Sequence, residues 1–268
     1  ASVVTSISKD HLDWLPKDEQ TIKKIVFEKT STLLNSNIIV AKQSTKETMD
    51  CIKKTIKENL SNKVFFNDDF SYSINENDFF YYQDQFGGLK LSKPNVLGQF
   101  QLENVSTAIA TLRTLNLSIK DEHIKKGILK IYSLARLQEI KTGKLKKLVK
   151  NNKLLIDGSH NENGSYALNK YLQSLDCKKH VIIGMMANKE HEKYLSYFKD
   201  ISSITTIDLK TQPNSISGKK LKDKCKNIPN VQYQPSIEQA INSIDLKEGD
   251  LLLITGSLYL AGEVLNLN

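Results

Sequence analysis

The feature that most constrains the fold of this chain is a regular alternation of strand-like and helix-like segments after residue 136. Short apolar runs typical of strands lie near residues 145–150, 153–157, 180–184, 203–209, 231–233 and 250–254. Segments with the apolar spacing of helices lie near residues 162–174, 190–199, 217–226, 236–244 and 257–265. Such an alternation is typical of a βαβ sheet with right-handed crossovers. We therefore predict an α/β domain over residues 136–268.

The pattern upstream of this domain is different. Strands are expected there at residues 3–7, 37–41, 64–67, 70–74, 79–83 and 89–92. The sequence Phe86-Gly87-Gly88 favours a hairpin between the last two of them. Helices are expected at residues 18–34, 45–60, 100–115 and 123–131. This change of pattern, which no linker or shift in composition accompanies, predicts a separate first domain over residues 1–135.

The composition is that of a globular protein of a reducing compartment. Of the 268 residues, 39% are hydrophobic and 25% are charged. No apolar run approaches the ~20 residues that a membrane helix needs, and the N-terminus lacks the basic and apolar regions of a signal peptide. The 3 cysteines are widely spaced and form no C-x-x-C motif. We therefore expect neither a disulfide framework nor a zinc knuckle, and a cytoplasmic protein.

The positive charge of the chain comes almost entirely from lysine. The net charge is +8, a property shared with many nucleic-acid-binding proteins, but Arg113 and Arg136 are the only arginines. The lysines are spread over helix faces with little aromatic interleaving, which favours a solvated surface over a nucleic-acid patch. Because lysine serves elsewhere, the two arginines are expected where the planar, bidentate guanidinium fork is required.

Polar residues gather where three of the expected strands end. Residues 157–161 (DGSHN), 184–189 and 255–257 each follow such a strand. Ligands of parallel α/β sheets bind beyond the carboxyl ends of the strands, so a site is expected here. Asp157 suits a hydrogen bond to a ribose, and His160 beside a helix N-terminus suits an anionic group. A capped turn explains each segment about as well, so these residues alone leave turn and active site open.

Four further positions have both a functional and a structural interpretation. His11 follows the first strand with an acid before it, which permits metal ligation. Lys29 and Glu28 are typical of a solvent-facing charge pair. Asn104 shares a helix face with the glutamine one turn before it, for binding or for capping. Arg136 stands at the domain junction, where it can close onto a phosphate or form a surface salt bridge.

Two common phosphate-binding motifs do not occur. The sequence contains neither G-x-x-x-x-G-K-[ST] nor G-x-G-x-x-G. From the residues alone, the chain is therefore an α/β protein with a site at its strand ends and unspecified chemistry.

A set of short segments spread over essentially the whole chain allows a more specific prediction of the chemistry. They are TSISKDHLDWL, FEK, GQFQLEN, ARLQ, LLIDGSHN, VIIGMMANK and TGSLYLAGEV. In this order they resemble the dihydrofolate synthase/folylpolyglutamate synthase family of the Mur ligase superfamily. The resemblance implies a central ATPase domain that binds ATP, Mg²⁺ and the pteroate substrate, followed by a smaller Rossmann-like domain. It also implies ATP-dependent addition of L-glutamate to dihydropteroate or to folate through an acyl phosphate.

The resemblance implies roles for five residues on the nucleotide and metal side. His11 is expected to ligate Mg²⁺. Lys29 corresponds to a family lysine that is carbamylated near the metal and takes part in catalysis. Asn104 and Asp157 fall at nucleotide-contacting positions. Arg136 falls at the phosphate-contacting arginine of the domain hinge and is expected to be catalytic.

On the other side of the reaction, the resemblance places three residues toward glutamate and the reacting centre. These are His160, Ser257 and Tyr259, with His160 also expected to act in catalysis. The chain departs from the family at Phe100, where histidine is usual, at Thr30, which follows the lysine, and in a longer spacing between the metal-side histidine and lysine.

The resemblance also implies that parts of the family enzyme are absent. The phosphate loop, the folate-binding segment and a metal-binding glutamate lie upstream in the family, and the opening ASVVTSI reads as a strand already in progress. We therefore expect a partial central ATPase domain at residues 1–135, a Rossmann-like glutamate-ligase domain at 136–268, and no activity of this chain alone.

The expected partners are small molecules, namely L-glutamate and dihydropteroate or folate, with no nucleic acid and no membrane. The family is usually monomeric, so a monomer is expected. Two alternatives remain open: another Mur-type amide ligase, or a non-catalytic module that retains the fold.

Overall fold

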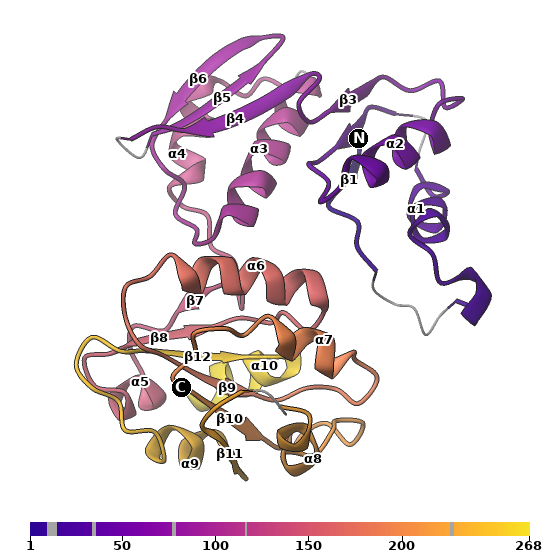
Figure 1. Cartoon of the computed structure of the whole chain (residues 1–268). Helices are drawn as coiled ribbons and strands as arrows, with labels where there is room; N and C mark the ends of the chain where they lie inside the picture. Colours follow the sequence, from indigo (N-terminus) through magenta and orange to yellow (C-terminus); the bar gives the residue numbers. More distant parts are fainter. Residues whose placement is uncertain (10–14, 34–35, 77–78, 116, 226–227) are drawn as a thin grey trace. The chain divides into compact units, whose positions relative to one another are not determined.

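The computed structural model describes residues 1–9, 15–33, 36–76, 79–115, 117–225 and 228–268. It divides into two compact units, Ala1–Tyr132 and Ser133–Asn268, each drawn in Figure 1. Within the described residues, no helix combines the length and the apolar character that crossing a membrane requires.

The first unit begins with a small parallel sheet. Its strands are β1 (Ser2–Val4), β2 (Ile38–Val40) and β3 (Lys63–Phe65), paired in that order. The helical elements along it are a 3₁₀ turn (Lys17–Glu19), α1 (Ile22–Thr30) and α2 (Lys46–Thr55). Buried side chains such as Val26, Ile38 and Ile52 pack the two helices and the sheet into one apolar cluster.

The expected helix at 18–34 starts later than predicted. The Thr21 hydroxyl accepts from the Lys24 N–H at 3.2 Å and caps α1, so the preceding residues form the separate 3₁₀ turn. A side-chain cap of this kind gives a helix a defined start, which apolar spacing alone does not locate.

The second part of the first unit is an antiparallel sheet covered by helices. It contains β4 (Phe70–Ile74), β5 (Phe80–Asp84), β6 (Gly87–Leu91), α3 (Gln99–Thr114) and α4 (Asp121–Ile128). β5 pairs with both neighbours, and Asp84 lies opposite Gly87 across a two-residue loop, which confirms the predicted hairpin. Phe80 and Tyr82 of β5 belong to the same buried apolar cluster as Leu102 and Ile109 of α3.

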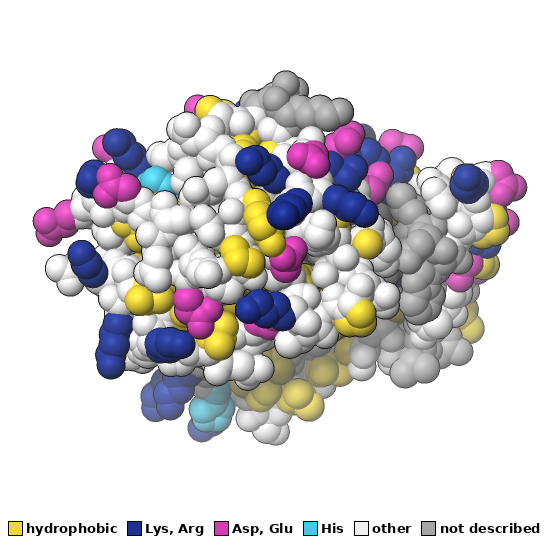
Figure 2. All heavy atoms as spheres, turned by 90° about the horizontal axis from the view of Figure 1, so that it is seen from below, with side chains coloured by type: hydrophobic (Ala, Val, Ile, Leu, Met, Phe, Trp, Pro, Cys, Tyr) yellow, Lys and Arg dark blue, Asp and Glu magenta, His cyan; other side chains and the backbone are white. Residues whose placement is uncertain are grey.

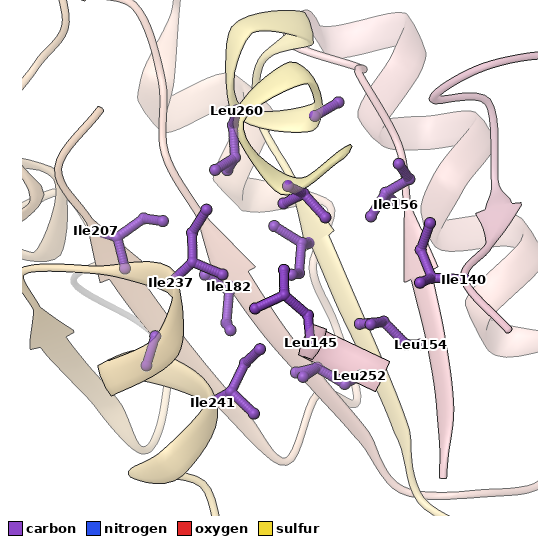
Figure 3. Packing of buried hydrophobic residues seen from close by; sticks show 14 of the residues in the cluster. Ile140, Leu145, Leu154, Ile156, Ile182, Ile207, Ile237, Ile241, Leu252 and Leu260 are labelled. Carbon is purple, nitrogen blue, oxygen red and sulfur yellow. The ribbon is translucent and has the colours of Figure 1, made fainter. Parts of the chain in front are cut away.

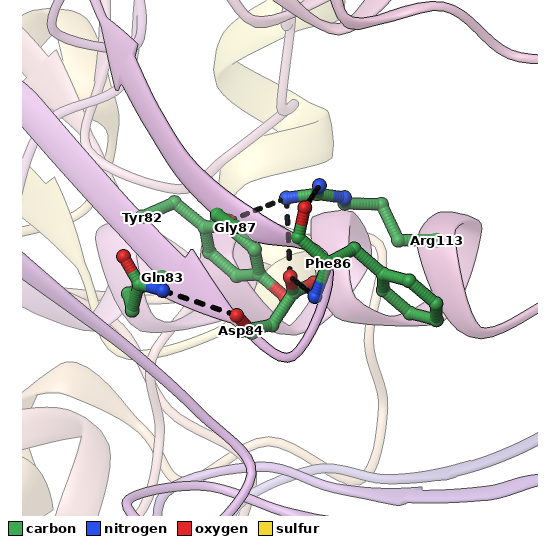
Figure 4. A network of polar contacts seen from close by, with 6 residues as sticks. All are labelled: Tyr82, Gln83, Asp84, Phe86, Gly87 and Arg113. Carbon is green, nitrogen blue, oxygen red and sulfur yellow. Dashed lines mark hydrogen bonds and ion pairs between the residues drawn. The ribbon is translucent and has the colours of Figure 1, made fainter.

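Arg113, one of the two arginines, holds this hairpin turn. It donates to the carbonyls of Phe86 and Gly87, both at 3.0 Å, and lies 3.2 Å from Asp84 (Figure 4). A lysine presents no planar fork and could not meet these three acceptors in the same way. Arg113 therefore has a structural role, which is to hold the turn of the hairpin.

The second unit is built around a six-stranded sheet. The strands are β7 (Gln138–Glu139), β8 (Lys153–Ile156), β9 (Lys179–Ile183), β10 (Ser203–Ile207), β11 (Val231–Gln234) and β12 (Leu251–Thr255). The helices are α5 (Lys144–Leu148), α6 (Glu162–Gln173), α7 (His191–Ser196), α8 (Gly218–Asp223), α9 (Ile237–Asn242) and α10 (Leu258–Leu267). The order is β11-β10-β9-β12-β8-β7, parallel except for β7.

The core of this unit lies between the sheet and the helices on its faces. Figure 3 shows Leu145 of α5, Ile241 of α9 and Leu260 of α10 meeting Ile182 and Leu252 from the sheet. α6 and α7 lie on the opposite side of the sheet from α5 and α9 (Figure 1). Helices on both faces explain why the central strands read as continuous apolar runs rather than alternating ones.

The predicted strand at 145–150 is wrong, because this segment forms α5. Leu145, Leu148 and Val149 stand at i, i+3 and i+4, and Leu145 and Val149 are 0% and 1% exposed. This spacing is that of a helix face, and the short apolar run concealed it. The antiparallel edge strand β7 was not predicted, since two polar residues carry no strand signal.

Charged side chains are mixed on the surface. On the face drawn in Figure 2, Lys and Arg are interspersed with Asp and Glu among uncharged and apolar areas.

Candidate active site

The polar segments at the strand ends meet at one edge of the second unit. Strand β12 lies between β8 and β9, with Ile254 opposite Ile156 and Thr255 opposite Ile183. Because the three strands are parallel, the segments that follow them, at residues 157–161, 184–189 and 255–257, leave from the same edge. The expectation that these segments share an edge is confirmed by the pairing.

Asp157 is the first residue after β8 and is buried, with 3% of its surface exposed. Its Oδ1 accepts from the Ser159 N–H and its Oδ2 from the Leu137 N–H, both at 2.8 Å. Burial raises the pKa of the Asp157 carboxyl, while bonds from Ser159 and Leu137 and the charge of Arg136 act in the opposite direction. Both carboxylate oxygens of Asp157, a predicted nucleotide contact, therefore accept hydrogen bonds from backbone N–H groups of the protein.

The segment around Arg136 has an unusual backbone. Ala135 and Leu137 have φ angles of 52° and 50°, in the left-handed region that non-glycine residues seldom adopt. Both are buried, while Arg136 between them is exposed. The Ala135 carbonyl accepts from the Gly158 N–H at 2.8 Å, and the Ala135 N–H donates to Oε1 of Gln138 at 2.9 Å. These bonds hold the strained segment and leave the guanidinium pointing away from the core.

His160 and Asn161 complete the turn into α6. The Nδ1 of His160 lies 2.9 Å from the Gly158 carbonyl, which can only accept, so Nδ1 carries the proton. Asn161 caps α6 by accepting from the Gly164 N–H at 2.8 Å, as a capped turn requires. The cap accounts for Asn161 but not for the half-buried imidazole beside it.

Ser257 and Tyr259 open α10 on the neighbouring strand. Ser257 is 2% exposed, and its Oγ accepts from the Tyr259 N–H at 3.1 Å, so the hydroxyl caps the helix. Tyr259 has 53% of its surface exposed. Gly256 before them has a φ of +107°, and a Cβ there would lie 2.8 Å from the Gly184 carbonyl. Glycine is therefore required for the ends of β9 and β12 to approach this closely.

Three buried hydroxyl groups join these segments. The Tyr194 hydroxyl, from α7, lies 2.9 Å from Oγ1 of Thr255 and 3.2 Å from Oγ of Ser159. The Thr255 and Ser159 hydroxyls are 3.4 Å apart. The sequence analysis did not select Tyr194, because a tyrosine at helical spacing among apolar residues looks like an ordinary core position.

The predicted residues of the first unit are on different elements. Lys29 is exposed near the end of α1, and Glu28 beside it pairs with Lys24 at 3.1 Å rather than with Lys29. Asn104 is exposed on α3, and its Nδ2 donates to Oε1 of Gln101 at 3.1 Å, so the two share a helix face as expected. His11 lies outside the described residues.

Comparison with known proteins places the strand-end segments in a family. Residues 143–258 match the family described as Mur ligase, glutamate ligase domain. A dihydrofolate synthase/folylpolyglutamate synthase of Bacillus subtilis is 22% identical over 285 residues, covering 98% of this chain and 61% of that protein. A dihydrofolate synthase/folylpolyglutamate synthase of Escherichia coli is 23% identical over 269 residues, covering 98% of this chain and 59% of that protein.

The fold of this chain has a close counterpart among solved structures. The structure described as E. coli FolC in complex with DHPP and ADP matches with a TM-score of 0.82 and 24% identity, over 98% of this chain and 60% of that one. This confirms the predicted α/β fold. The chain spans about three fifths of the length of the folate-branch relatives it matches.

A second branch of the Mur ligases is also similar. A UDP-N-acetylmuramoyl-L-alanyl-D-glutamate–2,6-diaminopimelate ligase of Buchnera aphidicola is 30% identical over 185 residues, covering 64% of this chain and 34% of that protein.

The metal that the Mur ligase resemblance implies has no complete ligand set among the described residues. These contain no group of three or more His, Cys, Asp or Glu side chains placed to hold a metal ion. Lys29 as an ammonium group cannot ligate a cation, since it has no acceptor. The described part of the chain therefore does not by itself form a metal site.

Proposed function

We propose that this chain is part of an ATP-dependent ligase that joins L-glutamate to dihydropteroate, to folate, or to both. In this reaction a carboxylate oxygen of the acceptor attacks the γ-phosphorus of ATP and ADP leaves, giving an acyl phosphate. The amine of glutamate then attacks the acyl carbon, loses a proton and expels phosphate. Phosphorylation is needed because a carboxylate is a poor electrophile.

The observation that carries the proposal is the attachment of the Arg136 segment to the DGSHN segment. Two bonds, from Gly158 to Ala135 and from Leu137 to Asp157, fix both sides of Arg136. A guanidinium held on a strained, well-anchored backbone is suited to a planar bidentate contact with phosphoryl oxygens. Strain of this kind persists where the surroundings determine the geometry, and it concentrates at functional sites.

The amino-acid side of the reaction falls to the neighbouring turns. His160, with its Nδ1 on a backbone carbonyl, has a fixed ring orientation suited to an anionic group or a proton transfer. The first turn of α10, with Ser257 and the exposed Tyr259, adds a helix N-terminus that favours a carboxylate. We assign these three residues to glutamate and the reacting centre.

The nucleotide and metal side is proposed from the family resemblance. Asn104 and Asp157 are assigned to the nucleotide, and His11 and carbamylated Lys29 to Mg²⁺. Carbamylation would turn the exposed ammonium of Lys29 into an anion able to sit beside a cation. Incorporation of ¹³C-labelled bicarbonate, lost in Lys29→Arg, is the measurement that checks this assignment.

The decisive experiment is incorporation of labelled L-glutamate with ATP and either dihydropteroate or a folate. It is run on the 268-residue chain and on the protein that its coding sequence specifies when read further upstream. We expect no ligation by the chain alone, because its sequence contains no phosphate-loop motif. Ligation is expected when an upstream G-x-x-G-K-[ST] segment is present.

The two proteins test different parts of the proposal. Ligation by the isolated chain would contradict the prediction that the reaction requires an upstream phosphate loop. Failure of a protein with an intact upstream phosphate loop to ligate glutamate would overturn the ligase, and would favour a non-catalytic module that retains the fold.

A second candidate is a Mur-type ligase with another amino-acid substrate. The similarity to the diaminopimelate ligase over 185 residues favours it. Assaying diaminopimelate and L-glutamate side by side, with a nucleotide-linked peptide and a pteroate as acceptors, separates the two. Activity with diaminopimelate alone would replace the folate assignment.

A further inference from the structure

Tyr194 occupies a position where a hydroxyl group requires an explanation. It lies on α7, and its side chain is 0% exposed. Its ring packs against Phe198 at a centroid distance of 5.3 Å, so the aromatic body fills an apolar space that phenylalanine would fill equally well. A buried hydroxyl costs free energy unless it is hydrogen-bonded. The fold therefore gains something other than packing from this group.

The Tyr194 hydroxyl joins two of the strand-end segments. It lies 2.9 Å from Oγ1 of Thr255, the last residue of β12, and 3.2 Å from Oγ of Ser159 in the DGSHN segment. With the 3.4 Å separation of Ser159 and Thr255, the three groups close a triangle. Each hydroxyl has one donor and two acceptor positions, so a closed triangle satisfies all three donors.

The triangle is connected to the rest of the candidate site. The Ser159 N–H donates to Oδ1 of Asp157, whose other oxygen holds Leu137 beside Arg136. On the other side, Thr255 precedes Gly256 and Ser257, which begin the first turn of α10. Ser165 of α6 also donates its hydroxyl to the Tyr194 carbonyl at 2.5 Å, which fixes α7 to the helix that follows the DGSHN segment.

The hydroxyl stays protonated in this setting. Burial raises the pKa of Tyr194 well above its usual range, while the bonds to Ser159 and Thr255 act in the opposite direction. A neutral phenol can donate to one neighbour and accept from the other, as the contacts with Thr255 and Ser159 require.

We propose that Tyr194 is a positioning residue that sets the spacing between the segment carrying His160 and the turn carrying Ser257 and Tyr259. Because its side chain is 0% exposed, we assign it no direct contact with nucleotide or amino acid. It acts through Ser159 and Thr255, and the inference rests on the proposed ligase function for its effect on turnover. A chain with phenylalanine here would keep the core and lose the alignment of the two segments.

The first test measures the alignment without requiring activity. Hydrogen–deuterium exchange is followed in the 268-residue chain for wild type and Tyr194→Phe. We expect amide exchange at residues 158–161 and 255–257 to rise together by about tenfold, with the amides of β9 and β10 unchanged, as local opening of a hydrogen-bonded segment predicts.

The matched control is Tyr233→Phe. Tyr233 of β11 donates its hydroxyl to Oδ2 of Asp208, the residue after β10, at 2.6 Å, so this bond lies away from the two segments. This variant should leave exchange at 158–161 and 255–257 as in wild type. Unchanged exchange at either segment in Tyr194→Phe, or a uniform rise through the whole unit, would overturn the proposal.

Thr255→Val, which leaves Tyr194 in place, tests the same triangle if Tyr194→Phe folds poorly, and together the two variants form a double-mutant cycle. Thr255→Val removes one hydroxyl of the triangle with little change of shape. If the triangle acts as a unit, the exchange rates of Tyr194→Phe/Thr255→Val equal those of the single variants rather than their product. Independent, multiplying effects would contradict a shared network.

The second test measures turnover in the protein that carries the phosphate loop. We expect Tyr194→Phe to lower kcat about tenfold and to raise KM for the amino acid, with KM for ATP unchanged. A parallel change in all three constants would indicate a purely structural role. If wild type itself ligates no glutamate, the proposed function fails, while the exchange experiment still decides whether Tyr194 couples the two segments.

Discussion

The backbone N–H of Leu137 donates to Oδ2 of Asp157 at 2.8 Å, across twenty residues of sequence. The carboxylate predicted to contact a nucleotide is thus also the group that holds the segment carrying Arg136. Because its other oxygen holds Ser159, Asp157 connects the residue proposed for phosphate with the turn that carries His160. Changes at Asp157 should therefore affect the folded structure as well as any ligand.

Asp157→Asn should destabilise the second unit by about 1–3 kcal/mol. The carboxylate accepts from two backbone N–H groups, and an amide has only one oxygen, so one N–H would face an NH₂ group. The free energy of unfolding is measured by urea denaturation. The control is Asp176→Asn, at an exposed position, which should stay within about 0.5 kcal/mol of wild type. Equal stability of the two variants would contradict this bracing role.

The stability difference between wild type and Asp157→Asn should depend on pH. Burial raises the folded-state pKa of Asp157 above its value in the unfolded chain. Between the two values the folded state binds more protons, so the stability that Asp157 contributes is complete below the unfolded pKa and declines as pH rises through the folded one. The advantage of wild type over the variant should therefore shrink as the pH rises above the ordinary pKa of an aspartate, 3.8. An advantage that grows with pH would show that the pKa is lowered instead.

Arg136→Lys should impair the ligase reaction without affecting stability. The side chain is exposed, and the neighbouring backbone is held by bonds that the substitution leaves in place. Loss of the bidentate fork should lower kcat/KM for ATP by about 10–100-fold, since each charge-assisted bond contributes about 1.5–3 kcal/mol. The measurement is glutamate ligation by a protein that carries the phosphate loop, with Lys170→Arg at an exposed position of α6 as control. A variant with wild-type kinetics would place the phosphate contact elsewhere.

Much of the fold of the second unit could be predicted, because buried parallel strands and amphipathic helices leave a clear periodic signal. The exceptions have physical reasons. Leu145 of α5 and Val149, which caps it, lie in a segment too short for the spacing of its apolar residues to distinguish a helix from a strand. Strand β7 pairs only Gln138 and Glu139, whose place in the sheet depends on tertiary contacts rather than on propensity.

The candidate site could be predicted only in part. The clustering of DGSHN with residues 255–257 follows from the rule that parallel strands end at one edge. The left-handed backbone at Ala135 and Leu137 could not be foreseen, since neither residue favours that conformation. Tyr194 carries no local signal, because what distinguishes it is the meeting of its hydroxyl with two segments distant in sequence.

Arg113→Lys should destabilise the hairpin of the first unit by about 1–3 kcal/mol. The guanidinium serves two carbonyls and Asp84 from a position where its side chain is 13% exposed. A lysine keeps the charge but leaves at least one of these three acceptors without its partner. Amide exchange in β5 and β6 should rise while β8 and β12 stay unchanged. Equal protection in wild type and variant would mean that charge alone suffices.

Gly256→Ala should be among the most damaging single changes in the second unit. The residue has a φ of +107°, and an added Cβ would lie 2.8 Å from the Gly184 carbonyl and 2.9 Å from Ile183. Backbone strain and steric displacement of the β9 end should together cost about 2–4 kcal/mol. Gly262→Ala is the matched control, because that glycine lies within α10 with nothing within 4 Å of the new methyl group. There the same substitution should stabilise the helix by up to about 1 kcal/mol. Hydrogen exchange of the β12 amides measures both effects, which should have opposite signs. A Gly256→Ala variant as protected as wild type would show that the two strand ends can separate without loss, and would remove the steric reason for glycine between Thr255 and Ser257.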